Sequence, residues 1–158
     1  MRKVVPVGQL PGFIRSLKKK NLKIVLAGGC FDVLHLGHVI FLQKAKKKGD
    51  VLMVMLESDR KAGELKGENR PIHTQKGRTE ILSALEAVDY VVPLPYMRND
   101  AEYDRLVGKI MPDVIAATVG GNNIHHQRLS KLTGAKLKFV TKKIGNYSTS
   151  KILNSTVQ

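Results

Sequence analysis

The sequence predicts an α/β fold in which helices cover both faces of a doubly wound, five-stranded parallel sheet. Short apolar runs of strand length alternate along the chain with segments of helical character, and this alternation is typical of crossover units in parallel sheets. The length of 158 residues fits a single domain, and no internal repeat or low-complexity segment indicates another architecture.

The strands are expected where the short apolar runs lie. The predicted strands are Lys23–Ala27, Val51–Leu56, Tyr90–Val92, Val114–Ala117 and Lys136–Thr141. A sheet of this kind is Rossmann-like, and its ligands bind beyond the carboxyl ends of the strands, where the strand order reverses.

Helices are expected between the strands. They cover about His38–Lys48, Gln75–Ala87, Asp100–Ile110 and Ile124–Leu132, and a last helix begins near Ser148. In the second of them Ile81, Leu85 and Val88 recur at i, i+4 and i+7, which predicts one apolar stripe facing the sheet. In the first, residues 39–42 are all apolar, so its first turn is expected to be buried on most sides.

Residues 1–22 precede the first strand and are expected to form an N-terminal extension with a helix from Pro11 to Lys19. Residues 23–158 are expected to form the domain itself. The extension could cover an edge of the sheet or contribute to the interface of a homodimer.

The composition points to a protein that binds anions. The formal net charge of +14 implies attraction to nucleotides, phosphorylated metabolites or nucleic acid, although a solvated lysine surface would give the same number. Aromatic residues make up 5% of the chain and tryptophan is absent, so stacking platforms for single-stranded nucleic acid are few. The single cysteine, Cys30, fits a reducing cytoplasm, and no apolar run is long enough to span a membrane.

The stretch GGCFDVLHLGHVIF, from Gly28 to Phe41, contains two histidines whose role decides the function. A metal site needs a third ligand, and no cysteine or histidine follows His38 within thirty residues, which leaves Asp32 as the close candidate. A packed core histidine does not fit a stretch this rich in glycine. Glycines before a helix allow phosphates to approach the backbone, so the pair is interpreted as hydrogen-bond donors for a triphosphate.

This stretch resembles the HxGH signature of the cytidylyltransferase-like nucleotidyltransferases, here His35-Leu36-Gly37-His38. The resemblance implies that His35 and His38 are catalytic. It also implies that the surrounding residues bind the nucleotide, namely Gly28, Gly29, Cys30, Phe31 and Gly37.

Three further stretches resemble the same family in the same order. ELKGENRPI is similar to its mobile lysine loop, which implies a catalytic role for Lys66. KGRTEILSALEAVDYVVP is similar to the following helix and strand, which implies that Arg78 is the nucleotide-binding motif arginine. GNYSTSKI is similar to its second signature, which implies nucleotide contacts from Ser148, Thr149, Ser150 and the preceding Lys143. Taken alone, Lys66 could be a solvated loop lysine, Arg78 a surface residue and the hydroxyl residues helix caps.

The resemblance implies transfer of a nucleotidyl group from ATP or CTP to a phosphorylated small molecule, with release of pyrophosphate. Mg²⁺ is expected to arrive with the triphosphate, and no protein metal ligands are expected. His73, His125 and His126 are interpreted as solvent-exposed rather than as ligands.

The stretches GGCFD, LKGENRPI and ALEAVDYVVPL look most like the adenylyltransferase portion of ADP-heptose synthases, which implies a heptose phosphate as acceptor. Those enzymes usually carry Lys-Gly-Gly-Asp-Tyr after the fourth strand, where this chain has Ala117 to Asn123 without the lysine and the acid. Lys143 is closer to glycerol-3-phosphate cytidylyltransferases, and archaeal FAD synthetases, which adenylylate FMN, share the framework. A non-enzymatic, basic nucleic-acid-binding protein is the alternative from another functional class.

Overall fold

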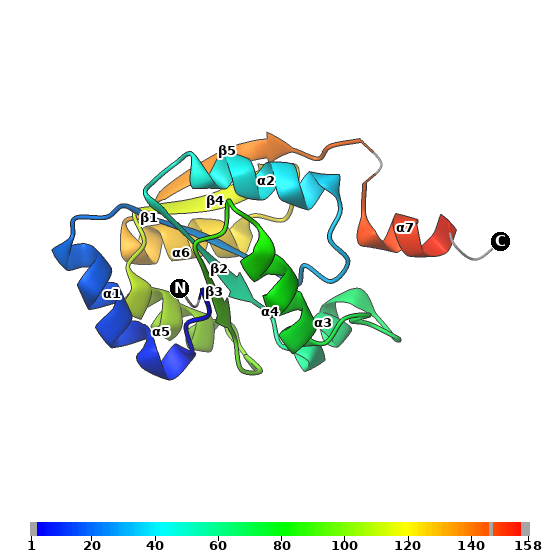
Figure 1. Ribbon diagram of the computed structural model, residues 1–158, viewed down its shortest axis with the longest axis horizontal. Helices are drawn as coiled ribbons and strands as arrows, with labels where there is room; N and C mark the ends of the chain where they lie inside the picture. Colours follow the sequence, from blue (N-terminus) through cyan, green and yellow to red (C-terminus); the bar gives the residue numbers. More distant parts are fainter. Residues whose placement is uncertain (1–2, 146, 156–158) are drawn as a thin grey trace.

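The computed structural model describes residues 3–145 and 147–155 and contains one five-stranded, all-parallel sheet (Figure 1). The strand order is β3-β2-β1-β4-β5, which confirms the predicted doubly wound topology. The strands are β1 (Ile24–Gly29), β2 (Val51–Leu56), β3 (Tyr90–Pro93), β4 (Val114–Val119) and β5 (Lys136–Lys142). Each of them lies within two residues of the predicted range at either end.

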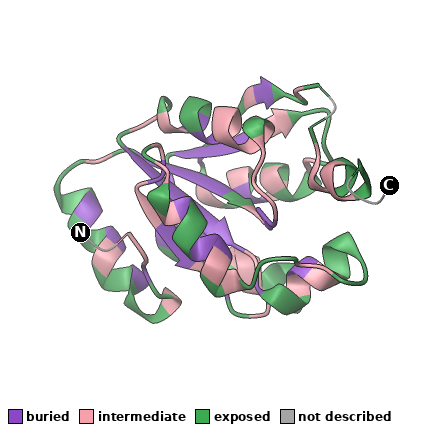
Figure 2. Ribbon diagram, turned by 45° about the vertical axis from the view of Figure 1, so that its right-hand side comes forward, coloured by how far each residue is buried: buried purple, intermediate pink, exposed green. Residues whose placement is uncertain are grey.

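The described chain contains seven α-helices, five of which cover the two faces of the sheet. They are α1 (Leu10–Lys19) after the short 3-10 turn η1 (Val7–Gln9), α2 (Leu36–Lys46), α3 (Asp59–Lys66), α4 (Gln75–Ala84), α5 (Asp100–Ile110), α6 (Ile124–Thr133) and α7 (Thr149–Ser155). Buried side chains of α1, α5 and α6 form one apolar cluster with the sheet, and those of α2 and α4 form the other. Figure 2 shows the buried sheet between these two layers.

The structure corrects the predicted second crossover helix, because α4 ends at Ala84 instead of Ala87. Leu85 is already extended, with φ −75° and ψ 130°, so Val88 reaches the core from a turn. Ile81 is 38% exposed, whereas Leu82 is fully buried. The buried side of α4 is therefore set by Leu82 and Arg78, four residues apart, and the predicted apolar stripe was wrong.

Two further sequence expectations about helices need correction. The segment of Lys66 was expected to be a loop, but α3 forms there because the Ser58 hydroxyl accepts a hydrogen bond from the Lys61 amide at 3.2 Å and caps its first turn. In α2, the side chains of Val39 to Phe41 are half-buried and Leu42 is fully buried, so this turn is less enclosed than expected.

The N-terminal segment covers an edge of the sheet. The Val5 amide donates to the Val91 carbonyl at 2.9 Å, and the Val91 amide donates to the Lys3 carbonyl at 2.8 Å, so the chain pairs with the outer side of β3. In α1, Leu10, Ile14 and Leu17 are buried in the core of the domain. Of the two roles expected for residues 1–22, the structure shows the covering of the edge.

Within the described ranges, no helix combines the length and the apolar character needed to cross a lipid bilayer.

Replacing Ile14 tests whether the N-terminal segment belongs to the domain core. Ile14 is 4% exposed, so Ile14→Ala removes buried apolar volume and should lower the free energy of unfolding by about 2–4 kcal/mol. The exposed neighbour Arg15 is the control, since Arg15→Ala should change it by less than about 0.5 kcal/mol. Equal, small effects of both variants in urea unfolding would mean that α1 does not pack on the sheet in solution.

Candidate active site

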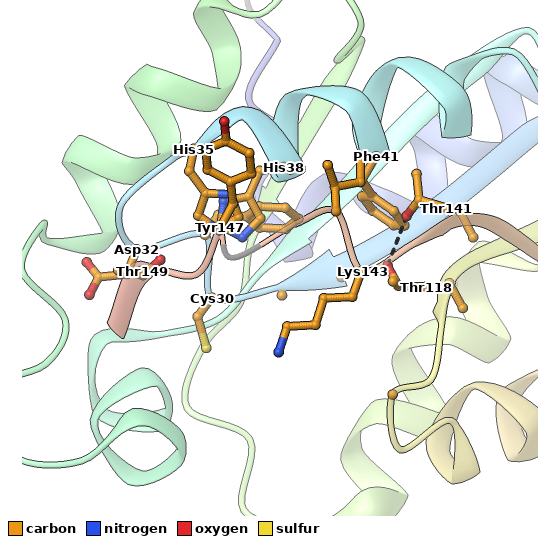
Figure 3. Close-up of a pocket in the computed structure, with 18 of the residues that line it drawn as sticks. Cys30, Asp32, His35, His38, Phe41, Thr118, Thr141, Lys143, Tyr147 and Thr149 are labelled. Carbon is orange, nitrogen blue, oxygen red and sulfur yellow. Dashed lines mark hydrogen bonds between the residues drawn. The ribbon is translucent and has the colours of Figure 1, made fainter. Parts of the chain in front are cut away.

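A crevice opens where the strand order reverses, beyond the carboxyl ends of β1 and β4. These two strands are neighbours, and the crossovers that follow them run on opposite faces of the sheet, so the connecting segments separate there. The crevice has a volume of about 360 Å³ (Figure 3). Its lining includes many of the predicted site residues, namely Gly28, Gly29, Cys30, Phe31, His35, Gly37, His38, Lys66, Lys143 and Thr149. Arg78, Ser148 and Ser150 are not part of this lining.

The histidine pair lies at the start of α2. His35 occupies the N-cap position, and the His38 ring stacks on the His35 ring with a centroid distance of 3.8 Å and an interplanar angle of 23°. The Nδ1 atoms of both rings are buried and have no hydrogen-bond partner among the described residues. Because a buried polar atom without a partner costs free energy, the pair is arranged for a polar ligand rather than for the folded chain alone.

Burial also sets the charge of the pair. Burial, followed by the nearby His35 and Lys66, lowers the pKa of His38 to about 4. Burial lowers the pKa of His35 as well. Both rings are therefore neutral near pH 7, and each carries one N–H that can donate to an oxygen of a ligand.

The glycines of the first signature make room for the protein's own rings. A Cβ at Gly37 would lie 3.0 Å from the His35 ring, and a Cβ at Gly29 would lie 3.0 Å from the ring of Phe31. Sequence interpretation assigned these glycines to the approach of phosphates. The structure adds a second reason, because a side chain at either glycine would force the ring of His35 or Phe31 to shift by a few tenths of an ångström.

Lys66 reaches the crevice from the last turn of α3, and the loop that follows is held by Asp32. The Asp32 carboxylate accepts hydrogen bonds from Arg70 Nε at 2.5 Å, from the Ile72 amide at 2.8 Å and from the His73 amide at 3.0 Å. Burial alone would raise the pKa of Asp32, but these hydrogen bonds and the Arg70 charge hold it below its usual value. Asp32 therefore fixes the loop that follows Lys66.

Arg78 is buried beside the crevice, and its side chain is 0% exposed. The guanidinium donates to the Cys30 carbonyl at 2.5 Å, to the His73 carbonyl at 3.0 Å and to the Asp59 carboxylate at 2.7 Å. Because its side chain is buried, Arg78 is not a surface residue. Its hydrogen bonds also mean that Arg78 does not reach the crevice in this structure and acts on it by holding these three segments together.

The second signature is joined to the first by a hydrogen bond. The Thr149 hydroxyl donates to the Val33 carbonyl at 3.0 Å, which places the start of α7 beside the histidine pair. The Ser148 hydroxyl accepts from the Lys151 amide at 3.1 Å and caps the helix. Asn146, within the same signature, lies outside the described residues. Lys143 lines the crevice just after β5 and points into it (Figure 3).

Sequence reasoning missed His126, which lines the crevice from the first turn of α6. Its Nδ1 is buried without a partner among the described residues, and burial, followed by the nearby His125, lowers its pKa. His126 was expected to be solvent-exposed. Its position after the fourth strand, at the predicted switch point, was the signal that could have identified it. Other lining residues not predicted include Phe41, Thr118, Thr141 and Tyr147.

Over residues 3–145 and 147–155, no three His, Cys, Asp or Glu side chains lie close enough to hold a metal ion.

Comparison with known proteins identifies relatives. A family model described as "Cytidylyltransferase-like" matches residues 26–154. A "Bifunctional protein HldE" from Nitratiruptor sp. is 48% identical over 101 residues, which cover 64% of this chain and 21% of that protein. A protein of the same name from Wolinella succinogenes is 43% identical over 139 residues, which cover 82% of this chain and 28% of that protein. The chain thus spans less than a third of the length of these curated relatives.

Solved structures share the fold. A lipopolysaccharide core biosynthesis protein from Thermoplasma volcanium superimposes with a TM-score of 0.60 at 28% identity and covers 80% of this chain and 99% of its own. A pantoate-beta-alanine ligase from Francisella tularensis, complexed with beta-gamma ATP and beta-alanine, gives a TM-score of 0.65 at 16% identity over 99% of this chain and 74% of its own. The second likeness shows the fold alone.

Replacing Arg78 tests whether the site depends on its buried guanidinium. Arg78→Met should lower the free energy of unfolding by about 2–4 kcal/mol, because the Cys30 and His73 carbonyls lose a buried donor and the half-exposed Asp59 loses its partner. Arg98→Met is the matched control, since the exposed Arg98–Glu102 pair should contribute less than about 1 kcal/mol. Similar unfolding curves for the two variants would contradict the structural role of Arg78.

The pKa of His38 predicts a pH-dependent stability. Unfolded His38 takes up a proton near its ordinary pKa of 6.5, whereas folded His38 stays neutral down to about 4, so protonation favours the unfolded chain between these values. The stability of the wild type relative to His38→Gln should therefore fall by about 2–3 kcal/mol between pH 7 and pH 4. Urea unfolding of both proteins across this range measures the difference. A difference that stays constant with pH would show that His38 titrates normally.

Proposed function

The chain belongs to the cytidylyltransferase-like family of nucleotidyltransferases, and from this premise we propose that it transfers a nucleotidyl group from an NTP to a phosphorylated small molecule. The observation that carries the proposal is the stacked, neutral pair His35 and His38, whose buried Nδ1 atoms have no partner among the described residues. This pair lies at the end of β1 in a crevice that Lys66 and Lys143 also line. Two neutral donors and two cations suit the oxygens of a triphosphate.

In the proposed reaction an oxygen of the acceptor phosphate attacks the α-phosphorus of the NTP. The new P–O bond forms as the bond to pyrophosphate breaks, and the bonding electrons leave with pyrophosphate. The attacking oxygen is already ionised at neutral pH, so no residue has to remove a proton. Catalysis then depends on positioning and on stabilisation of the charge that develops on the leaving group.

We assign separate roles in this catalysis to the histidines, lysines and glycines of the crevice. The N–H groups of His35 and His38 would donate to the phosphate oxygens on which charge increases. Lys66, from the end of α3, and Lys143, from the end of β5, would add positive charge from two separate elements. Gly28 and Gly29 would leave the backbone at the end of β1 open to the nucleotide.

Magnesium would enter as part of the substrate, bound to the triphosphate. Asp32 lines the crevice, but its oxygens accept hydrogen bonds from Arg70, Ile72 and His73, so its carboxylate is engaged by the protein. Mg²⁺ retains several waters and binds substrate phosphates readily, so it requires few ligands from the chain.

For the substrates we propose ATP and a heptose phosphate. The stretches GGCFD, LKGENRPI and ALEAVDYVVPL, which resemble the adenylyltransferase portion of ADP-heptose synthases, support this choice. The relatives named HldE and the lipopolysaccharide core biosynthesis protein are consistent with it. The loop after β4 departs from the pattern of those enzymes, and its residues Gly121 to Asn123 line the crevice, so it is the segment where acceptor or base recognition would differ.

A pyrophosphate-release assay tests the reaction and the substrates together. ATP, CTP and GTP are each combined with heptose 1-phosphate, glycerol 3-phosphate or FMN in the presence of Mg²⁺. We expect the fastest release with ATP and heptose 1-phosphate. Release with CTP and glycerol 3-phosphate, or with ATP and FMN, would replace the proposed substrates but keep the reaction class. No release with any pair would contradict nucleotidyl transfer to these acceptors.

Replacing His38 tests the role of the pair. His38→Ala should lower kcat by about 10²–10³, the effect usual for removing one donor to a developing charge. His125→Ala is the control, because His125 is exposed outside the crevice and should leave kcat unchanged. Circular dichroism confirms that both variants fold. Full turnover by the His38→Ala variant would contradict the proposed role.

A further inference from the structure

The end of the molecule opposite the crevice carries a concentration of lysines. In a parallel sheet every strand begins at the same end, and the crossover helices finish there. Figure 1 shows the end of α1 and the connection from α2 to β2 at this end, far from α7. The lysine face is defined here as the exposed lysines of these helix ends and strand starts, Lys18, Lys19, Lys20, Lys23, Lys47, Lys48, Lys131 and Lys136.

Three of these lysines meet at one cavity. Lys18 at the end of α1, Lys23 before β1 and Lys136 at the start of β5 line a space of about 400 Å³, which is also lined by Met111, Thr133 and one acid, Asp113. Three separate parts of the chain therefore bring lysines to one place, where they outnumber the single acid that lines the cavity.

Three acids at this end offset part of the positive charge, and each of them also holds a backbone amide at a strand start. The Asp50 carboxylate accepts from the Lys23 amide at 2.8 Å, and the Asp113 carboxylate accepts from the Ile24 amide at 2.8 Å. Asp89 accepts from the Leu52 amide at 2.6 Å and pairs with Lys46. A lysine in the last turn of a helix favours the helix dipole, but runs of three exceed that need and lie far from the proposed reaction.

An apolar side chain lies among these lysines in an unfavourable setting. Met111 caps α5 in the left-handed conformation, with φ 46° and ψ 62°, and is 43% exposed. Glycine is the usual residue at such a cap, and Gly134 takes this role, with φ 74°, at the end of α6 beside the same cavity. Met111 therefore bears a conformational cost and leaves part of its apolar surface in water beside the lysines.

We propose that the lysine face docks on an anionic lipid surface, with Met111 entering the head-group region. Each lysine close to such a surface strengthens binding about fivefold, and an apolar side chain among them gains by leaving water. A nucleic-acid backbone would satisfy the lysines but offer nothing to Met111, which is why the lipid surface is favoured. The crevice, at the other end of the strands, stays open to its substrates.

Co-sedimentation of the full chain with lipid vesicles tests the proposal. The vesicles contain phosphatidylcholine alone or phosphatidylcholine with about one third phosphatidylglycerol, an anionic lipid. We expect binding to the anionic vesicles, little binding to the neutral ones, and a loss of binding as salt increases. Equal binding to both kinds of vesicle, or to neither, would overturn the proposal.

Matched charge variants locate the surface. Lys18→Gln/Lys23→Gln/Lys136→Gln should weaken binding about a hundredfold. The control Lys76→Gln/Arg98→Gln/Arg105→Gln removes the same number of charges from exposed residues elsewhere and should have a much smaller effect. Equal losses in the two triple variants would show that net charge, and not this face, is responsible.

The variant Met111→Gly separates a lipid surface from a nucleic acid. It relieves the left-handed cap, so the free energy of unfolding should not fall, yet vesicle binding should weaken severalfold. Unchanged vesicle binding by Met111→Gly, with binding to an oligonucleotide that requires the lysine face, would assign the face to nucleic acid instead. Because both measurements are independent of nucleotidyl transfer, their failure is distinct from a failure of the proposed function.

Discussion

The geometry of the crevice depends on two buried opposite charges that hold one loop between them. The Arg78 guanidinium donates a hydrogen bond to the His73 carbonyl, and the Asp32 carboxylate accepts one from the His73 amide. The backbone of His73 is therefore held at both its carbonyl and its amide. The same two side chains bind Asp59, where α3 begins, and Arg70, after α3 ends. Buried charges are stable when partners and peptide groups surround them, and here their partners are the segments on either side of Lys66.

The histidine pair differs from Asp32 and Arg78 in its hydrogen bonding. Asp32 and Arg78 make their hydrogen bonds inside the protein, whereas His35 and His38 keep buried nitrogen atoms without partners among the described residues. Burial keeps the two imidazole rings neutral, and the stacking of one ring on the other fixes their orientation. A charged ligand with several oxygens would supply hydrogen-bond partners that the folded chain lacks. Lys66 and Lys143, which line the same crevice, give it the positive charge that attracts a triphosphate. The lysine face at the opposite end carries further positive charge, for which we propose a separate role.

The fold and the first signature were largely predictable from the sequence, and tertiary contacts explain the remainder. The apolar runs predicted β1, β2 and β4 because these strands are largely buried on both faces, and the strand order placed the histidines at the switch point. Local pattern could not show that Arg78 is buried, since its three partners lie between five and 48 residues away in the sequence. The local pattern also did not predict α3, because the composition of this helix is polar. It assigned Ile81 to the core, because the spacing of apolar residues does not show that the helix ends at Ala84. His126 was not predicted as a site residue, because the local sequence around a histidine does not show which distant residues lie next to it in the folded protein.

Imidazole NMR of the free and nucleotide-bound protein tests the central claim most directly. Titration of the ¹⁵N shifts of His35 and His38 gives the pKa of each ring with and without the magnesium complex of a non-hydrolysable ATP or CTP analogue. We predict that the pKa of His38, about 4 in the free protein, rises when phosphates face the ring, and that its N–H resonance becomes protected from exchange with water. Nucleotide binding that leaves both pKa values and both N–H resonances unchanged would contradict the account.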